Sequence, residues 1–147
     1  MSIGLFEEKM NRLKSNCEYG SFEYHDSSVT FSSVATEHFR NLARRQKYGV
    51  YIIRQLSSDK VLYIGKSGTI DRQGKFKGQD IPGRLKNVKG DVSANEWFTS
   101  LVNEKGALMI EYIFLETSPE SPSLVEAILL QKYFNEHGCL PYRNKSF

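Results

Sequence analysis

Two tyrosines flank a short polar turn in the stretch KYGVYIIRQLSSDKVLYIGK, which covers residues 47–66. Each belongs to a tripeptide that contains glycine, GVY at 49–51 and YIG at 63–65. Side chains alternate between the two faces of a strand, so Tyr51 and Tyr63 can lie side by side if the two segments pair. Such a pair either packs in a core, as tyrosine often does in strands, or holds two hydroxyls over a reaction site.

The two residues that follow Tyr63-Ile64 extend this candidate site. Gly65 stands at the end of a predicted strand, where the lack of a side chain permits close approach by a ligand. Lys66 comes next, and three roles are open to its ammonium group. It stays in solvent, it reaches a phosphate, or it lowers the pKa of a neighbouring phenol through its positive charge.

Basic residues are concentrated in one segment of a chain whose formal net charge is only +3. Between Lys66 and Lys89 there are seven basic residues and two acidic ones. This pattern indicates either a surface that faces a polyanion or a solvated lysine-rich loop. A guanidinium can make forked contacts to phosphate oxygens, which makes Arg84 a candidate phosphate clamp and Arg72 its competitor. The candidates for further backbone contacts to a polyanion are Arg72, Lys75, Lys77, Lys86 and Lys89.

Glu126 is an acid among apolar neighbours in the segment SPSLVEAILLQKYF. One interpretation makes it part of a helix cap, because Ser123 and Glu126 have the spacing of a capping box. The other starts the helix at Ser121, with Pro122 in the first helical position, which leaves Glu126 one turn inside. In that second case the lone carboxylate suits a hard cation such as Mg²⁺, which binds one or two protein oxygens and keeps several waters.

Few other polar residues have a spacing that indicates chemistry. Asn144 lies in the C-terminal segment YRNKSF, where a plain turn residue is the alternative to a functional role. The two cysteines and three histidines are scattered along the chain and lack the spacing of a structural zinc site.

The elements that must position these residues follow from periodicity and turn signals. Helices are predicted over residues 3–17, 33–47, 82–89, 93–106 and 123–137, and strands over 49–55, 61–65 and 107–116. Residues 18–33 form a loop or a short strand, and residues 66–81 form a loop. The predicted class is α+β: a small three-stranded antiparallel sheet flanked by helices. Residues 1–47 form an N-terminal helical extension, and residues 48–147 form the main domain.

Composition excludes other classes of protein. A hydrophobic fraction of 39% and a charged fraction of 25% are ordinary for a globular domain. The chain has no apolar run of about 18 residues, the length expected of a membrane span. Its N-terminal stretch mixes acidic and basic residues and lacks the apolar core of a secretory signal, so a cytoplasmic location is expected.

Taken in order, these residues resemble the GIY-YIG nuclease family. The tripeptide at 49–51, with valine in place of isoleucine, stands for the first half of the family motif, and the tripeptide at 63–65 matches the second. Arg84, Glu126 and Asn144 follow in the family's order, so the resemblance covers about residues 48 to 147. It implies hydrolysis of a DNA phosphodiester.

The resemblance also implies how the chemistry would be divided. Glu126 would hold a divalent metal, Mg²⁺ or Mn²⁺, close to the phosphate and the leaving 3′ oxygen. Tyr51 would activate the attacking water. A free phenol titrates near pH ~10, so this role needs local positive charge from Lys66 or from the metal.

The remaining members of the set would bind and orient the phosphate. Arg84 would act as the clamp, while Tyr63 and Asn144 position groups at the site. The segment 66–89 would contact the DNA backbone independently of base sequence. Two features depart from the family pattern. The stretch before Arg84 is longer than in compact members, and the place where the family often has a histidine holds Val88.

The function expected from sequence is therefore that of a metal-dependent DNA endonuclease, with the small size of restriction-type members. One alternative is a structure-specific nuclease of repair or of mobile elements. Another is a domain that keeps the fold and binds nucleic acid without cleaving it. Both a monomer and a homodimer are compatible with the sequence, and symmetric target sites would call for a dimer.

Overall fold

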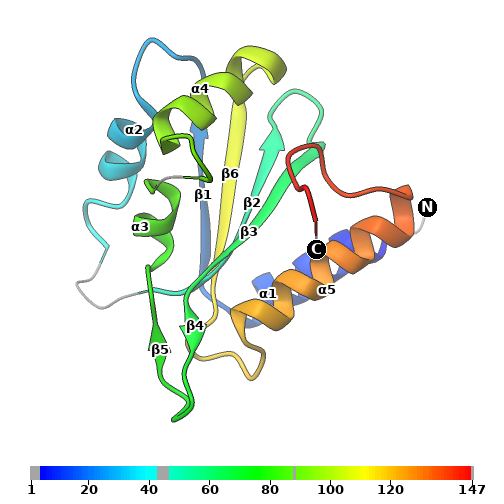
Figure 1. Cartoon of the computed structure of the whole chain (residues 1–147). Helices are drawn as coiled ribbons and strands as arrows, with labels where there is room; N and C mark the ends of the chain where they lie inside the picture. The colour runs from blue at the N-terminus through cyan, green and yellow to red at the C-terminus, as the bar shows by residue number, and fades with distance from the viewer. Residues whose placement is uncertain (1–3, 43–46, 88, 147) are drawn as a thin grey trace.

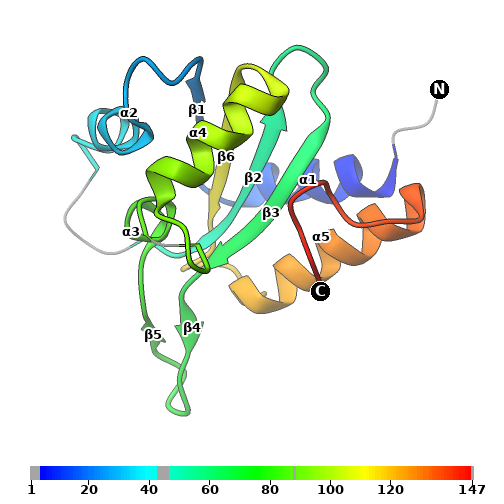
Figure 2. The same cartoon turned by 45° about the horizontal axis from the view of Figure 1, so that its top comes forward.

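A four-stranded antiparallel sheet, in the order β1-β6-β2-β3, lies between two layers of helices in the computed structural model (Figures 1 and 2). The structure describes residues 4–42, 47–87 and 89–146. The strands of the sheet are β1 (Tyr19–Tyr24), β2 (Gly49–Gln55), β3 (Val61–Ser67) and β6 (Leu108–Phe114). The helices are α1 (Leu5–Asn16), α2 (Phe31–His38), α3 (Ile81–Leu85), α4 (Ala94–Lys105) and α5 (Pro122–His137). A short hairpin of β4 (Thr69–Ile70) and β5 (Phe76–Lys77) projects from the body.

The α+β class is confirmed, but the predicted sheet of three strands is wrong because β1 adds a fourth. This strand falls in the segment predicted as a loop or a short strand, and it pairs along its whole length with β6. Its later residues alternate in burial, with Phe22 and Tyr24 in the core and Glu23 exposed between them. The aromatic residues interleaved in this polar segment were therefore the signal of a half-buried edge strand.

Each face of the sheet has its own hydrophobic cluster. On one face α1 and α5 pack on the sheet through Met10, Ile52 and Leu129, with further apolar residues around them. On the other face α2, α3 and α4 cover a cluster that includes Phe31 and Phe98, whose rings stack with centroids 3.5 Å apart. The segment expected as an N-terminal extension thus contributes to both layers, with α1 and α2, and to the sheet, with β1.

Helix caps decide several boundaries, including the one that places Glu126. The Ser121 hydroxyl accepts a hydrogen bond from the Leu124 backbone N–H, so α5 starts with Pro122 and Glu126 lies inside the helix. The alternative capping box that begins at Ser123 is wrong. At α4 the predicted cap is confirmed, because the Ser93 hydroxyl accepts from the Glu96 N–H.

Other boundaries differ from the predicted ones. Helix α2 ends at His38 instead of 47, and residues 43–46 of that predicted helix lie outside the described residues. Helix α3 ends at Leu85 instead of 89. The segment 66–81 was predicted as a loop and contains the β4–β5 hairpin, where the turn is held by the Asp71 carboxylate, which accepts from the N–H groups of Gln73 and Lys75. None of the helices in the described part of the chain combines the length and the apolar character that a membrane crossing needs.

The two glycines of the tyrosine tripeptides are required by close packing inside the sheet. At Gly49 a Cβ atom would lie 1.8 Å from the backbone oxygen of Ile113 on β6. At Gly65 it would lie 2.4 Å from the Cζ atom of Tyr51 and 2.8 Å from Cε2 of Tyr63. Gly65 is paired with Tyr51 across the β2–β3 ladder, so its missing side chain makes room for both phenol rings. The space beside Gly65, where the approach of a ligand was predicted, is occupied by the rings of Tyr51 and Tyr63.

We expect Gly65→Ala to destabilise the protein by about 1–3 kcal/mol, the usual cost of overpacking a dense core. The new methyl group would push on both tyrosine rings, and Tyr51 has no free space behind it because it is fully buried. Urea denaturation measures the change, with Thr69→Ala on the exposed strand β4 as the control. A variant as stable as the wild type would contradict this packing role.

Candidate active site

Four of the six predicted catalytic residues, Tyr63, Arg84, Glu126 and Asn144, line one cleft of about 480 Å³. They come from β3, α3, α5 and the C-terminal tail, so distant parts of the chain converge beside the free edge of the sheet (Figure 2). The cleft is also lined by Ile64, Lys89, Gly90, Trp97, Leu130, Arg143, Lys145 and Ser146.

The two tyrosines occupy different environments although they share one face of the hairpin. Their ring centroids are 6.0 Å apart, and Tyr63 is half-buried at the cleft. Tyr51 is fully buried, and its hydroxyl makes no hydrogen bond of standard geometry with any described residue. Burial raises the pKa of Tyr51, and the neighbouring Tyr63 adds to this rise, while Arg84 opposes it. Burial also raises the pKa of Tyr63, again against the charge of Arg84.

The expected lowering of the Tyr51 pKa is not observed, because burial raises it. Strand alternation gives a second reason. Tyr51 pairs with Gly65, whereas Lys66 pairs with Val50 and so projects from the opposite face of the sheet. There Lys66 acts on Glu126, whose pKa it lowers. The role of Lys66 shifts from activating a phenol to supplying positive charge beside the carboxylate.

Glu126 is a half-buried carboxylate in the first turns of α5. Burial raises its pKa, and the charges of Lys66 and Arg84 counter that rise. It makes no hydrogen bond or ion pair with the residues that the structure describes. A carboxylate taken partly out of water without a hydrogen-bonded partner is costly unless a cation compensates it.

This environment fits a divalent cation shared with a phosphate. Mg²⁺ commonly uses one or two carboxylates together with substrate phosphates and water. Over residues 4–42, 47–87 and 89–146 there is no group of three or more His, Cys, Asp or Glu residues that would form a metal cage by itself. Glu126 is thus the one candidate ligand among the predicted site residues, and any ion it holds would need oxygens from a substrate.

The choice between Arg84 and Arg72 is decided by position. Arg84 lines the cleft, and its charge acts on the pKa values of Tyr51, Tyr63, Lys89 and Glu126. Arg72 is exposed in the turn of the β4–β5 hairpin and does not line the cleft. Arg84 is therefore the candidate clamp.

Asn144 ties the C-terminal tail to the free edge of β3. Its Nδ2 donates to the Ile64 carbonyl oxygen at 2.9 Å, and its Oδ1 accepts from the Ile64 N–H at 3.0 Å. The side-chain amide thereby replaces the peptide group of a neighbouring strand. The Arg143 N–H donates to the Leu62 carbonyl oxygen at 2.9 Å and extends this pairing. Asn144 positions the tail, and with it Arg143, whose guanidinium lies 5.2 Å from the ring centroid of Trp97.

We expect Asn144→Asp to release the tail at the cost of about 1–3 kcal/mol, because one amide donor becomes an acceptor that faces the Ile64 carbonyl. Trp97 is the single tryptophan of the chain, so its fluorescence reports the loss of Arg143 from its ring. Lys145→Ala is the matched control, because Lys145 is the exposed residue next to Asn144. An unchanged Trp97 emission and unfolding curve for Asn144→Asp would rule out the role of Asn144 in anchoring the C-terminal tail.

The other basic residues divide into two groups. Arg72, Lys75 and Lys77 are exposed on the projecting hairpin, as expected of backbone-contact residues. Lys86 is exposed at the end of α3, where its Nζ donates to Thr36 Oγ1 at 3.3 Å. Lys89 differs from all of these, because it lines the cleft and is largely buried. Its predicted contact to DNA would therefore be made inside the cleft and not on the outer surface.

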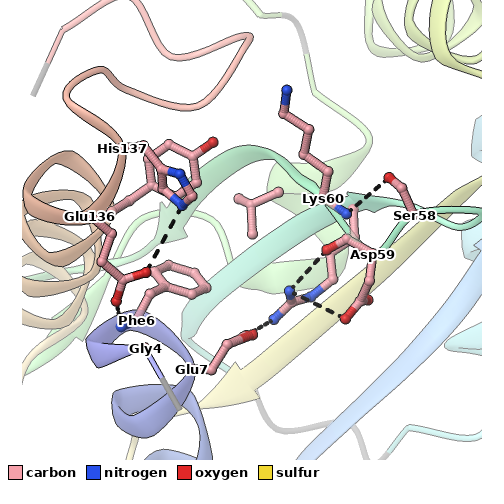
Figure 3. Close-up of a pocket in the computed structure, with 11 residues that line it drawn as sticks. Gly4, Phe6, Glu7, Ser58, Asp59, Lys60, Glu136 and His137 are labelled. Atoms are coloured by element: carbon pink, nitrogen blue, oxygen red, sulfur yellow. Dashed lines mark hydrogen bonds and ion pairs between the residues drawn. The ribbon is translucent and has the colours of Figure 1, made fainter. Parts of the chain in front are cut away.

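A second cavity, of about 410 Å³, lies at the far end of α5 (Figure 3). Glu7 and Asp59 both approach the guanidinium of Arg54 there, and Glu136 accepts from the Phe6 backbone N–H at the start of α1. These charges are already occupied in ion pairs and a helix cap. We interpret this cavity as part of the structural network and not as the site.

Trp97 and Arg143 were missed as site residues by sequence reasoning. Trp97 was predicted as a buried helix residue, and its ring instead lies between Tyr63 and Arg143 at the cleft. The signal for Arg143 was its place beside Asn144, since a residue that fixes the tail also fixes its neighbour.

Comparisons of the chain with protein-family models, curated proteins and solved structures found no match.

Proposed function

We propose that this chain is a metal-dependent DNA endonuclease that hydrolyses phosphodiester bonds in the cleft between β3, α3 and α5. The observation that carries the proposal is the convergence of Tyr63, Arg84, Glu126 and Asn144 on that cleft. They are separated in sequence by other elements, and they follow the order of the family that the sequence resembles. A cytoplasmic location and a restriction-type role belong to the same proposal.

Each residue of the cleft answers a need of the reaction. Arg84 carries a permanent charge suited to forked contact with phosphate oxygens. Glu126 would hold Mg²⁺ or Mn²⁺, and such an ion supplies charge to the phosphate and to the leaving 3′ oxygen. Tyr63 offers a hydroxyl at the cleft, and Asn144 keeps the tail in place beside it.

The exposed basic residues support DNA as the substrate. Arg72, Lys75 and Lys77 are exposed on the projecting β4–β5 hairpin, whose root follows directly on the end of β3 (Figure 1). A smaller pocket at the root of the hairpin is lined by Lys66, Lys77 and Arg84. Positive charge therefore continues from Arg84 towards the hairpin. A polyanion that lies along this path would place one phosphate at Arg84.

Incubation of supercoiled plasmid with the protein tests the proposal. We expect nicked or linear product with Mg²⁺ and none after chelation of the metal. Arg84→Ala should lose cleavage, while Lys132→Ala on α5 serves as a variant outside the cleft. Discrete fragments would favour a restriction-type enzyme, and preference for branched DNA would favour a repair type. Binding of DNA without cleavage would contradict the enzymatic proposal.

A further inference from the structure

The Lys89 ammonium group sits among aromatic rings inside the candidate site. Its Nζ atom lies 5.7 Å from the ring centroid of Tyr51, 5.6 Å from that of Trp97 and 5.7 Å from that of Phe98. Its polar contact is a hydrogen bond donated to the Arg84 carbonyl oxygen at 3.2 Å. The side chain therefore has a fixed position within the cleft.

Burial, more than any neighbouring charge, disfavours the protonated form of Lys89. Tyr51 from β2, Tyr63 from β3, Arg84 from α3, Glu126 from α5, and Arg143 and Lys145 from the tail surround or line the same cleft. Lys89 forms no ion pair with any residue in the described part of the chain. Burial lowers the pKa of Lys89 to about 7, with a further contribution from the positive charge of Arg84. The free amine and the ammonium ion are then both populated at neutral pH.

We propose that Lys89 is the catalytic base of the cleft and takes a proton from the attacking water. This inference rests on the nuclease function proposed above. The water oxygen forms a bond to phosphorus while the bond from phosphorus to the 3′ oxygen breaks, and the electron pair of that bond stays on the 3′ oxygen. The water proton moves to Lys89 Nζ, which becomes an ammonium ion. The 3′ oxygen takes its proton from solvent.

The other groups at the cleft are less suited to this step. Arg84 is permanently protonated. The Tyr51 hydroxyl is enclosed in the core, and burial raises the pKa values of both tyrosines. Glu126 is the candidate metal ligand. A lysine whose amine loses its proton near neutral pH is a recognised form of general base.

This assignment gives Tyr51 a positioning role. Its ring forms one wall of the pocket that holds the Lys89 amine, and its hydroxyl is buried without a hydrogen-bond partner among the described residues. Tyr51→Phe retains that wall, so cleavage should stay within about tenfold of the wild type. A much larger loss in Tyr51→Phe would return the base role to the Tyr51 hydroxyl and overturn the assignment to Lys89.

The pH dependence of kcat/KM for cleavage of supercoiled plasmid with Mg²⁺, measured from pH 6 to pH 9, tests the role of Lys89. For the wild type, kcat/KM should rise with pH and level off above an apparent pKa of about 7, because the base acts in its deprotonated form. Lys89→Arg keeps the positive charge but cannot lose its proton. It should lower the plateau by about 10²–10⁴-fold, the usual contribution of general base catalysis. Lys132→Arg, outside the cleft, should behave as the wild type.

The outcomes separate this inference from the function on which it rests. Cleavage by Lys89→Arg at the wild-type rate would show a charge or packing role and overturn the inference. Persistence of the same pH dependence in Lys89→Gln would also overturn it. Absence of cleavage by the wild type at every pH would instead overturn the nuclease function. Circular dichroism of both variants, and NMR titration of ¹³C-methylated lysines in the wild type, keep the assignment testable if one variant misfolds. A wild-type protein with no lysine titrating near pH 7 would overturn the inference by itself.

Discussion

Replacing Glu126 by glutamine should lower plasmid cleavage by roughly 10³-fold or more, while the protein stays folded and at least as stable as the wild type. Glu126 is the one carboxylate among the described residues that line the cleft. A neutral amide of the same shape cannot supply the charge that holds a divalent cation against a phosphate. Removing one electrostatic contact at an active site commonly costs about 10²–10³-fold in rate, and loss of a metal removes more than one.

The expected gain in stability follows from the pKa of Glu126. Burial raises this pKa in the folded state, against the charges of Lys66 and Arg84. A carboxyl group with a raised folded pKa is easier to bury when it is protonated, so its ionisation weakens folding as pH rises above the unfolded value of about 4.3. Glutamine never ionises. The stability of Glu126→Gln relative to the wild type should therefore increase from pH 4 to pH 7.

Urea denaturation at both pH values, beside the cleavage assay, checks this pair of effects. Ser123→Ala on the same helix is the control, because Ser123 is exposed and does not line the cleft. A Glu126→Gln variant that cleaves DNA like the wild type would remove Glu126 from the site. A variant that loses both activity and stability would assign Glu126 a structural role.

Replacing Glu111 by alanine should lower the free energy of unfolding by about 3–5 kcal/mol, the usual cost of removing one partner of a buried ion pair. Glu111 is buried in the middle of β6. Its Oε1 accepts from Arg54 Nε at 2.6 Å, and its Oε2 accepts from Lys14 Nζ at 2.5 Å. The guanidinium of Arg54 is only 5% exposed, so loss of Glu111 leaves its Nε atom buried without an acceptor, with Glu7 and Asp59 as the remaining acidic partners of Arg54.

The same network predicts how this loss depends on pH. Burial raises the pKa of Glu111, but the hydrogen bonds from Lys14 and Arg54 outweigh it and leave the pKa lowered. A lowered folded pKa stabilises the protein above the unfolded value, and this contribution is lost as pH falls through the folded value. The difference between the wild type and Glu111→Ala should therefore shrink in acid.

Two further variants separate the ionic effect from packing. The double replacement of Arg54 and Glu111 by leucine should cost less than Glu111→Ala, because no buried charge is then left alone. Glu120→Ala breaks the more exposed pair with Lys9 and should cost under about 1 kcal/mol. Equal losses for Glu111→Ala and Glu120→Ala in urea denaturation would contradict the buried network.

The sequence predicted the hairpin, the central strand β6 and the cap of α4 because these depend on local patterns. Strand β1 was harder to assign, because its polar composition shows no clear alternation of apolar and polar residues. Its strand character depends on the pairing with β6, where Phe22 and Tyr24 are buried. The start of α5 stayed open between two serines of similar capping chemistry. Only the Ser121 hydrogen bond to the Leu124 N–H decides it.

The sequence predicted which residues form the candidate site better than it predicted the chemical role of each residue. Four spaced residues pointed to one cleft, yet the environments of Tyr51 and Lys89 depend on packing that no local pattern reports. The alternation of side chains along a strand could have corrected the predicted role of Lys66. Tyr63 and Lys66 are three positions apart in one strand, so they project from opposite faces of the sheet. The burial of Lys89 depends on the rings of Trp97 and Phe98 in α4, which come later in the chain.

Strand breakage in supercoiled plasmid, measured side by side for the wild type and Glu126→Gln with Mg²⁺ at pH 8, tests most directly whether the cleft hydrolyses phosphodiesters. We predict nicked and linear DNA with the wild type, and intact plasmid with Glu126→Gln at equal concentration. Intact plasmid with both proteins, or equal cleavage by both, would contradict the proposal.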